Sequence, residues 1–454
     1  MITLVRGFKD ILPADTALWQ HVEAMVRELL EDFGFAELRI PILEQTDLFA
    51  RSIGTSTDIV EKEMYTFTDR SGDSLTLRPE ATASVVRAYI EHGLYAKNPV
   101  CKLYTTGPMF RRERPQKGRY RQFYQINAEV FGLHDPRADA ELILVLMTCM
   151  GRLELPGIVL HINSLGCPEC RSKFKGALKP FLTGKVHELC SNCLRRRDKN
   201  PMRIFDCKVP TCKKAMLDAP SILDYLCETC QSHFETVKRS LDRFQIPYQI
   251  NHRLVRGLDY YTRTTFEVLA QALGAQDAVA GGGRYDGLVK ALGGPDQPAV
   301  GFAIGVDRLM ELLAARAQSF EKRPHLFIAA LGLRARDTAF QWVQDFRIQR
   351  VRAEMDFENR SLKSQMRRAD KLGVSYTLIV GDRELDDGAV VFRNMTTKEQ
   401  ENVPVQDLVE LVVLGLHFSR MRAPRDKFFC SYFLVSGVLF GVGCQVSGVR
   451  CKKH

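Results

Sequence analysis

Residues 110–131 read FRRERPQKGRYRQFYQINAEVF, and this stretch decides the fold that we expect for the chain. Polar Gln125, Asn127 and Glu129 alternate with mostly apolar residues, as in a strand with two different faces. The basic run over 110–121 contains a proline and a glycine, so we expect a loop between two strands there. A strand face with Gln, Asn and Glu suits the floor of a ligand site, and a solvated face is the alternative.

Three other stretches predict elements around this strand. Apolar residues at three- and four-residue spacing predict an amphipathic helix over 15–33. Residues 38–43 form a short apolar run with a proline, which is typical of an edge strand. Residues 299–309 read AVGFAIGVDRL and predict a strand that runs into a helix. The chain therefore mixes strands and helices.

Eight of the 13 cysteines lie in a Lys- and Arg-rich stretch that is typical of an inserted module over 156–245. They form four pairs, three of them with Cys-x-x-Cys spacing. Each pair can present two thiolates to one metal ion, so we predict structural Zn²⁺ at two sites of four thiolates. Buried free thiols are the alternative. The candidate ligands are Cys167, Cys170, Cys190, Cys193, Cys207, Cys212, Cys227 and Cys230.

The C-terminal part begins after a linker near residues 322–324. Apolar runs alternate there with helical patterns over 337–346 and 362–372, which predicts a small α/β domain over 325–412. Residues 413–454 form a tail that does not continue this pattern.

Within this tail, residues 428–449 carry no charged side chain and would span about 33 Å as a helix, which is bilayer length. A membrane anchor, an aberrant or disordered tail, and an element docked on the body all stay open. The stretch is rich in Gly, Ser and Val, so we do not expect a membrane partner.

Composition excludes several classes of protein. The 454 residues are 45% hydrophobic and 26% charged, which excludes collagen-like, coiled-coil and wholly disordered chains. The net charge of +10 divides into +6 for residues 167–230, +6 for residues 414–454 and −2 for the rest, so the main body is not basic. No secretory leader is visible, and cysteines at metal-ligand spacing favour a reducing compartment, so we expect a cytoplasmic protein.

Arginine recurs in three motifs that suit phosphate binding. The run over 110–121 holds six basic residues, and residues 254–261 read LVRGLDYY. Arg308 follows the glycine-flanked strand of 299–305. Arginine offers a permanently charged fork for phosphate oxygens. A structural ion pair is the simpler explanation of each motif alone, but not of all of them together.

The motifs together resemble those of the class II aminoacyl-tRNA synthetases. Residues 39–41, 110–132 and 301–308 are similar to motifs 1, 2 and 3 of that class. Residues 254–261 and the TLRPE block over 76–80 resemble segments of the histidyl-tRNA synthetases. The order of the motifs is that of the family.

The resemblance covers residues 1–412 and implies an α+β fold. It implies an antiparallel-sheet catalytic core over 1–155 and 246–320, with the Cys-rich domain inserted between the two parts. Residues 325–412 match the family's α/β anticodon-binding domain.

The implied reaction is ligation of L-histidine to tRNA(His). ATP with Mg²⁺ activates histidine as an adenylate, and a homodimer mediated by motif 1 carries out the reaction. A non-catalytic regulatory subunit of ATP phosphoribosyltransferase has the same fold and is the alternative. That class usually lacks the anticodon domain and the signature arginines, and this chain has both.

The resemblance also implies roles for single residues. Arg111, Arg256 and Arg308 match the catalytic arginines, and Glu113 and Arg119 join Arg111 and Arg308 in binding ATP. The histidine-binding set is Glu80, Thr82, Gln125, Glu129, Arg256, Tyr260 and Tyr261, with Glu129 and Tyr261 directed at the imidazole. The tRNA-binding set is Arg114, Lys117, Arg121, Lys363 and Arg367. One departure is Ala81, where many members have glycine.

Overall fold

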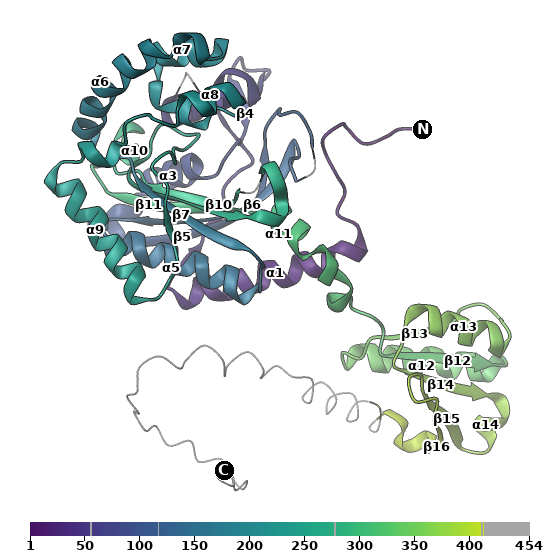
Figure 1. Ribbon diagram of the computed structural model, residues 1–454. Helices are drawn as coiled ribbons and strands as arrows, with labels where there is room; N and C mark the ends of the chain where they lie inside the picture. The colour runs from purple at the N-terminus through teal and green to yellow at the C-terminus, as the bar shows by residue number, and fades with distance from the viewer. Residues whose placement is uncertain (55–56, 117, 277, 410–411, 413–454) are drawn as a thin grey trace, which may run out of the picture. The chain divides into compact units, whose positions relative to one another are not determined.

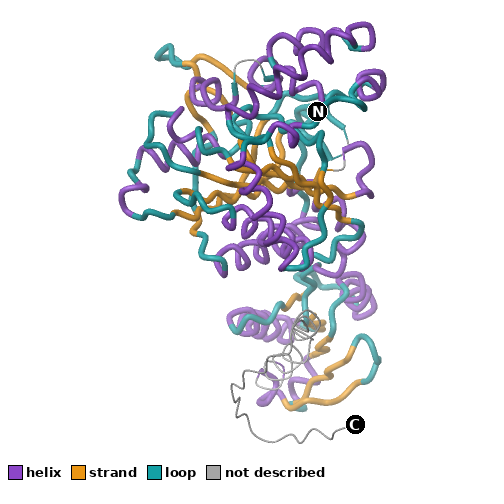
Figure 2. The backbone as a smooth tube through the Cα atoms, turned by 60° about the vertical axis from the view of Figure 1, so that its left-hand side comes forward, coloured by secondary structure: helices purple, strands orange, loops and turns teal. Residues whose placement is uncertain are grey.

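The computed structural model describes residues 1–54, 57–116, 118–276, 278–409 and 412 (Figures 1 and 2). The chain divides into two compact units, residues 1–321 and the part from Lys322 onward. Lys117 and the tail from residue 413, with its apolar stretch, lie outside the described residues. Among the residues that are described, no helix is both long and apolar enough to cross a membrane.

An eight-stranded sheet forms the centre of the first unit, drawn in orange in Figure 2. Its inner pairs are antiparallel, and only the edge strands β1 and β8 pair in parallel with their neighbours. This confirms the expected antiparallel core. The order across the sheet is β1 (Ala36–Glu37), β5 (Cys101–Phe110), β6 (Gln122–Phe131), β11 (Ala299–Gly305), β10 (Ala278–Arg284), β9 (Thr262–Ala270), β7 (Ile158–Ser164) and β8 (Gln249–Ile250).

The strand order joins the two parts of the core that the insert separates in sequence. β5 and β6 precede the insert, whereas β9, β10 and β11 follow it, and β6 pairs with β11 in the middle of the sheet. β6 is the strand predicted from the alternating residues, and β11 continues into α11 (Val306–Leu313) as expected.

Long helices cover one face of this sheet (Figure 1). Side chains of α1 (Pro13–Asp32), α5 (Arg137–Arg152) and α9 (Glu228–Arg243) share one buried core with the sheet. The spacing that predicted a helix over 15–33 is the buried face of α1, which consists of Leu18, Trp19, Val22, Val26, Leu29 and Leu30.

The edge strand predicted over residues 38–43 is wrong. Strand β1 ends before this segment, and only Leu43 belongs to the next strand, β2 (Leu43–Gln45). Pro41 has no N–H to donate to a sheet. Nη1 of the buried Arg78 donates to the carbonyl oxygen of Ile40 at 2.8 Å and to that of Pro41 at 3.2 Å. An arginine therefore satisfies carbonyls that a neighbouring strand would otherwise bind. β2 instead pairs with β4 (Ser74–Leu77), and β4 pairs with β3 (Tyr65–Thr68).

Helices α6 (Pro168–Gly184), α7 (Ser191–Lys199) and α8 (Pro210–Ala215) of the Cys-rich stretch lie on the side of the sheet opposite α1 (Figure 1). They share a buried cluster with α3 (Thr82–Glu91), Tyr261 and Tyr285. The insert therefore packs against the core rather than standing apart from it. It also contains the 3₁₀ helix η3 (Pro201–Asp206).

The second unit is the expected α/β domain. Its five-stranded sheet has the order β13 (Ala353–Met355), β12 (Leu326–Leu331), β14 (Tyr376–Gly381), β15 (Ala389–Asn394) and β16 (Gln400–Pro404). β12 pairs in parallel with β13 and β14, and the remaining pairs are antiparallel. The two predicted helices are confirmed as α12 (Leu333–Ile348) and α13 (Leu362–Leu372).

A fully buried ion pair between Arg284 of β10 and Asp139 of α5 ties the sheet to its helical layer. Arg284 Nε donates to Asp139 Oδ1 at 2.9 Å. We expect Asp139→Ala to lower the free energy of unfolding by about 3 kcal/mol, because it removes the one fully buried carboxylate partner of a buried guanidinium and leaves it only the partly exposed Asp286. Urea denaturation measures this loss.

The matched control is Asp296→Ala, which breaks the Lys290–Asp296 pair, whose side chains are 66% and 71% exposed. This variant should lose less than about 1 kcal/mol. Equal losses in the two variants would contradict a special role for the buried pair.

Candidate active site and cysteine clusters

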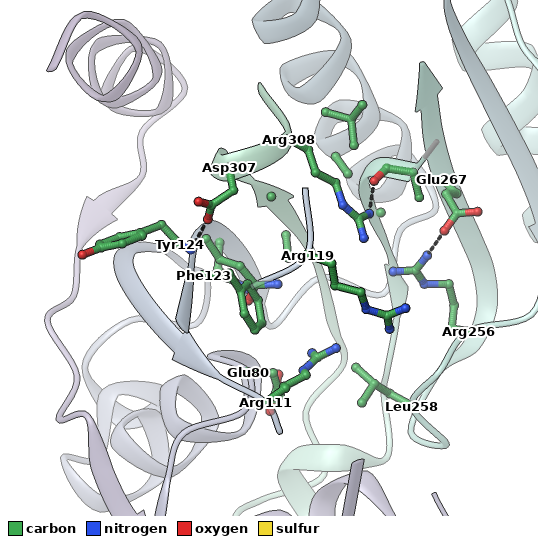
Figure 3. Close-up of a pocket in the computed structure, with 18 of the residues that line it drawn as sticks. Glu80, Arg111, Arg119, Phe123, Tyr124, Arg256, Leu258, Glu267, Asp307 and Arg308 are labelled. Carbon is green, nitrogen blue, oxygen red and sulfur yellow. Dashed lines mark hydrogen bonds and ion pairs between the residues drawn. The ribbon is translucent and has the colours of Figure 1, made fainter. Parts of the chain in front are cut away.

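A pocket opens on the sheet between β6, β9, β10 and the start of α11 (Figure 3). Polar and charged side chains from both parts of the core line it. Ten predicted site residues lie in its wall, namely Glu80, Thr82, Arg111, Glu113, Arg119, Gln125, Arg256, Tyr260, Tyr261 and Arg308. The structure therefore brings together residues that were grouped from separate motifs.

Four guanidinium groups from three segments converge in this pocket, as Figure 3 shows for Arg111, Arg119, Arg256 and Arg308. Arg111 Nε donates to the Pro79 carbonyl at 2.8 Å. Burial lowers the pKa of Arg111, although an arginine stays charged in proteins. Such a group of fixed cations suits a polyphosphate.

Each of the other arginines is held by an acceptor in the pocket wall. Arg256 Nη1 lies 2.7 Å from Glu267 Oε1, and Arg308 donates to the Ala278 carbonyl. Arg119 forms an ion pair with Glu113. These contacts orient the guanidinium groups before any ligand binds, which lowers the cost of ordering them on binding.

Glu129 lies at the buried polar end of the site and accepts two hydrogen bonds. Thr82 Oγ1 donates to Glu129 Oε1 at 2.7 Å, and Tyr285 Oη donates to Glu129 Oε2 at 2.5 Å. Burial raises the pKa of Glu129 to about 8, against the effect of both hydroxyl donors. The neighbouring Glu80 accepts from the Thr82 and Ala83 N–H groups at the start of α3, and burial raises its pKa as well.

Two buried side-chain oxygens on the pocket face of β6, Gln125 Oε1 and Asn127 Oδ1, have no hydrogen-bond partner among the described residues. The buried hydroxyl of Tyr260 in the pocket wall has none either. Buried polar atoms in folded proteins nearly always find partners, so these atoms indicate a polar ligand. The strand face predicted as a ligand floor is therefore partly buried and lines the pocket, and it is not a solvated face.

Two polar residues of the pocket wall, Asn127 and Glu267, had no predicted role in the site. Tyr285 was also not predicted; it lies behind the wall and bonds to Glu129. Tyr285, rather than Tyr261, donates to Glu129, while Tyr261 packs its ring 6.4 Å from that of Tyr285. The only sequence signal for Tyr285 was its position after the GGGR run of β10. Asn127 lies on the same face of β6 as Gln125, two residues away, so the alternation of polar residues was the sequence signal for it.

Two glycines of the sheet leave the room that these side chains need. A Cβ at Gly301 would lie 1.6 Å from Glu129 Oε2, and one at Gly281 would lie 2.6 Å from Arg256 Nη1. Any other residue at these positions would displace the carboxyl group of Glu129 or the guanidinium group of Arg256. This explains the glycine cluster in β10 and the glycine within β11.

The predicted tRNA-binding residues differ in their exposure and in their contacts. Arg114 is exposed in the loop after β5, and Lys363 and Arg367 are exposed on α13. Lys117 lies outside the described residues. Arg121 is partly buried and donates to the carbonyl oxygens of Glu113 and Arg6, so its guanidinium supports the loop itself.

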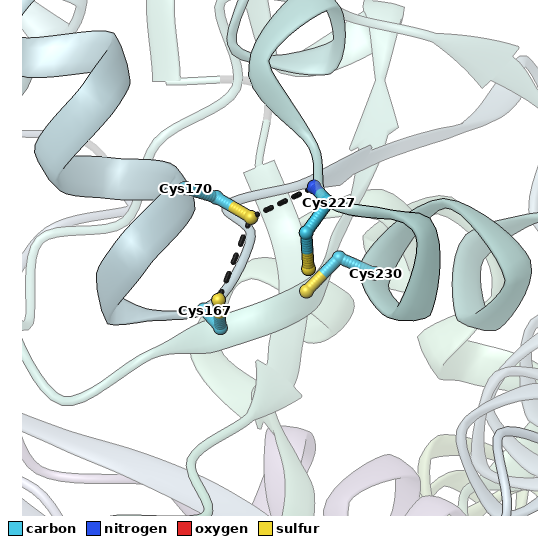
Figure 4. A group of neighbouring side chains, drawn as sticks. All are labelled: Cys167, Cys170, Cys227 and Cys230. Atoms are coloured by element: carbon cyan, nitrogen blue, oxygen red, sulfur yellow. Dashed lines mark hydrogen bonds between the residues drawn. The ribbon is translucent and has the colours of Figure 1, made fainter.

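The eight predicted metal ligands form two groups of four in the insert. The first pair joins the fourth as Cys167, Cys170, Cys227 and Cys230, which we name cluster 1 (Figure 4). The second pair joins the third as Cys190, Cys193, Cys207 and Cys212, which we name cluster 2. Within each cluster all sulfur atoms lie within 4.8 Å of one another.

The sulfur geometry of both clusters fits a tetrahedral zinc site. A Zn–S bond of about 2.3 Å places tetrahedral sulfurs about 3.8 Å apart. The Cys167–Cys170 and Cys190–Cys207 sulfurs lie 3.5 and 3.9 Å apart, too far for a disulfide. Cys167, Cys190 and Cys227 each precede the first residue of a helix. Burial raises the pKa of Cys167 and Cys190, but N–H groups and neighbouring thiols outweigh it and hold both at about 7.

Sequence profiles, related sequences and solved structures all match the same family. The sequence profile described as histidyl-tRNA synthetase matches residues 7–171 and 202–309, and an anticodon-binding domain profile matches residues 325–413. A histidine–tRNA ligase of Desulfatibacillum aliphaticivorans is 60% identical over 412 residues, which cover 91% of this chain and 98% of the relative. One of Geobacter sulfurreducens is 55% identical over 89% of this chain and 98% of the relative.

Solved structures agree. The apo histidyl-tRNA synthetase of S. aureus is 38% identical and superposes with a TM-score of 0.77, over 91% of this chain and all of that one. The enzyme of Nostoc sp. PCC 7120, at 20% identity and a TM-score of 0.66, shares the fold. The matching profiles, the relatives and the fold agree with the motifs, and the chain belongs to the histidyl-tRNA synthetase family.

Proposed function

We propose that this chain is a histidine–tRNA ligase, which activates L-histidine with ATP and transfers it to the 3′ end of tRNA(His). The observation that carries this function is the pocket in which four arginines converge beside the buried Glu129 and Tyr285. Identity of 60% over nearly the whole length of a histidine–tRNA ligase supports it. The signature arginines that a regulatory paralogue would lose are all present, so we set that alternative aside.

In the first step, the histidine carboxylate attacks the α-phosphorus of ATP, and the bond to the leaving pyrophosphate breaks. Negative charge that develops on the phosphoryl oxygens is stabilised by Arg111 and Arg256 in our proposal, while Arg308 holds the γ-phosphate end. Glu113 and Arg119 complete the ATP site. ATP enters with Mg²⁺, which neutralises part of the phosphate charge.

The buried polar end would recognise the histidine side chain. Glu129, oriented by Thr82 and Tyr285, can pair with an imidazole nitrogen, and a side chain without that nitrogen would leave the carboxyl buried and unpaired. Tyr261, with Tyr260 beside it, would also face the imidazole, and the substrate's amino and carboxylate ends would then lie near Glu80, Thr82 and Gln125. This extends the predicted histidine site by Tyr285.

The second step requires the tRNA acceptor end near the loop that contains Arg114, Lys117 and Arg121. We propose that Lys363 and Arg367 on α13 contact the anticodon arm, with phosphate contacts supplying much of the affinity. A homodimer and a cytoplasmic location stay predictions from the sequence.

Substitution of Arg256 tests the catalytic assignment. We expect Arg256→Ala to lower L-histidine-dependent ATP–pyrophosphate exchange by at least about 100-fold, because a fixed cation at the reacting phosphate is lost. Arg137→Ala is the control, since this arginine is 74% exposed on α5. Near-normal exchange by a folded Arg256→Ala protein would reject the role, and no exchange by the wild type would reject the proposed function.

The raised pKa of Glu129 makes a prediction about stability against pH. Between the unfolded value of about 4.3 and the folded value of about 8, the folded state holds a proton that the unfolded chain has lost. Rising pH therefore removes stability over this window. We expect the melting temperature of Glu129→Gln, relative to that of the wild type, to increase from pH 5 to pH 8 and then to level off.

Differential scanning fluorimetry at constant ionic strength measures this difference, and other titrating groups largely cancel in it. Glu91→Gln, whose carboxylate is 60% exposed in a pair with Arg87, is the control and should give a flat difference. A flat difference for Glu129→Gln as well would mean that its carboxyl is ionised at neutral pH.

We propose further that clusters 1 and 2 each bind one structural Zn²⁺. Four thiolates leave no open ligand position, so the ions would stabilise the insert and take no part in the chemistry. Gly166 supports cluster 1, since its φ of +60° suits glycine and a Cβ there would lie 2.5 Å from Cys170 Cβ.

Elemental analysis of the purified protein should give two zinc ions per chain. We expect Cys230→Ser to retain one, whereas Cys149→Ser, which removes a buried thiol outside both clusters, should retain two. A count of zero in the wild type rules out zinc at these cysteines.

A further inference from the structure

The segment over residues 254–261, which we call the signature loop, supplies Arg256, Tyr260 and Tyr261 to the pocket. It contains no helix or strand, since β8 ends at Ile250 and β9 begins at Thr262. Backbone hydrogen bonds of regular structure therefore do not hold its conformation. Contacts from other segments have to position the three side chains.

Cluster 1 contacts the C-terminal end of the signature loop. The carbonyl oxygen of Gly166, the residue before Cys167, accepts hydrogen bonds from Thr262 Oγ1 and from the Arg263 N–H, both at 2.9 Å. Arg171, the residue after Cys170, donates from Nη1 to the Tyr261 carbonyl at 3.1 Å. The residues on both sides of this cysteine pair are thus bonded to the chain around Tyr261.

The segment enclosed by cluster 2 contacts the loop further along its length. Between Cys193 and Cys207, Arg203 of η3 donates from Nη1 to the Arg256 carbonyl at 2.6 Å. Asn200 Nδ2 donates to Asp259 Oδ1 at 2.9 Å. Arg203 is only 9% exposed, so its hydrogen bond is shielded from water.

Hydrophobic packing holds only part of this enclosed segment. In η3 the side chains of Pro201, Met202 and Ile204 are buried on both sides of Arg203. In α7 the only buried side chain is that of Cys193, a member of cluster 2, and the helix has nine residues, fewer than an isolated helix needs for stability. A metal ion joining Cys190 and Cys193 to Cys207 and Cys212 would tie the two ends of the segment together. It would add this constraint to the packing of η3 and so restrict the part of the chain that carries Asn200 and Arg203.

We infer that the two cysteine clusters position the signature loop, with Arg203 and Arg171 as the positioning residues that transmit the constraint to Arg256 and Tyr261. The inference rests on the proposed zinc binding and on the proposed ligase function. It makes histidine recognition dependent on the metal content of the insert. ATP binding should depend on it much less, because Arg111 and Arg308 belong to β5–β6 and α11.

The test is ATP–pyrophosphate exchange, with KM measured separately for L-histidine and for ATP. We expect Arg203→Ala to keep two zinc ions per chain, to raise the KM for histidine about tenfold or more, and to change the KM for ATP less than about twofold. Partial recovery is expected for Arg203→Lys, which keeps a donor. Wild-type protein stripped of zinc with a mercurial and a chelator should show the same selective loss.

Two further variants guard the result. Asn200→Ala removes the contact to Asp259 and should show a smaller loss of the same kind, which keeps the test open if Arg203→Ala does not fold. Arg197→Ala is the matched control, because Arg197 lies on the same helix, α7, and its guanidinium pairs with the adjacent Asp198 and not with the signature loop. Its two KM values should equal those of the wild type.

The outcomes separate this inference from the proposals beneath it. An unchanged KM for histidine in Arg203→Ala overturns the positioning role. An equal rise in the KM for histidine and the KM for ATP on zinc removal overturns it as well. Zero zinc in the wild type overturns the metal dependence and the proposed zinc sites together. Absence of any histidine-dependent exchange in zinc-loaded wild type overturns the ligase function instead.

Discussion

The antiparallel pairing of β6 with β11 is the constraint on which the site depends. Its register sets Glu129 opposite Gly301 and Gln125 opposite Gly305, so a strand before the insert faces one after it. Asp307 extends the pairing beyond β11, because its carboxylate accepts the N–H of Tyr124 at 2.7 Å. A shift of one residue would turn Glu129 to the helical core and place a side chain where glycine is required. The contacts of Glu129 with Thr82 and Tyr285 depend on this register.

Local periodicity was enough to predict the helices and strands that bury one face at a single regular spacing. Helix α1 and strand β6 each show a single spacing in the sequence, and both lie where that spacing puts them. The segment over residues 38–43 has equally apolar residues but is not a strand, because Arg78, which is distant in sequence, binds its carbonyl groups. No local pattern contains that contact. The fold class was thus predictable, while the boundaries at the proline were not.

The site divides in the same way. Its arginines were predictable because each lies in a motif whose order resembles that of a known family. The hydrogen bond between Glu129 of β6 and Tyr285, which lies just after β10, joins residues that no motif grouped, and only the finished sheet brings them together. The cysteine spacing likewise predicts pairs but cannot tell which pairs join. The first pair joins the fourth because α6 and α9 both start at the same place on the insert.

Both faces of the sheet bury apolar side chains, but they differ in the space that they leave open, and the cysteine clusters lie on the more open side. The face covered by α1, α5 and α9 buries apolar side chains, so the hydrophobic effect is sufficient there. The opposite face has to leave space for a charged ligand, and glycines replace larger side chains at Gly281 and Gly301. Loops without regular structure border that space. In our proposal, a metal ion bound by each cysteine cluster would cross-link the chain at the base of such loops without filling the pocket.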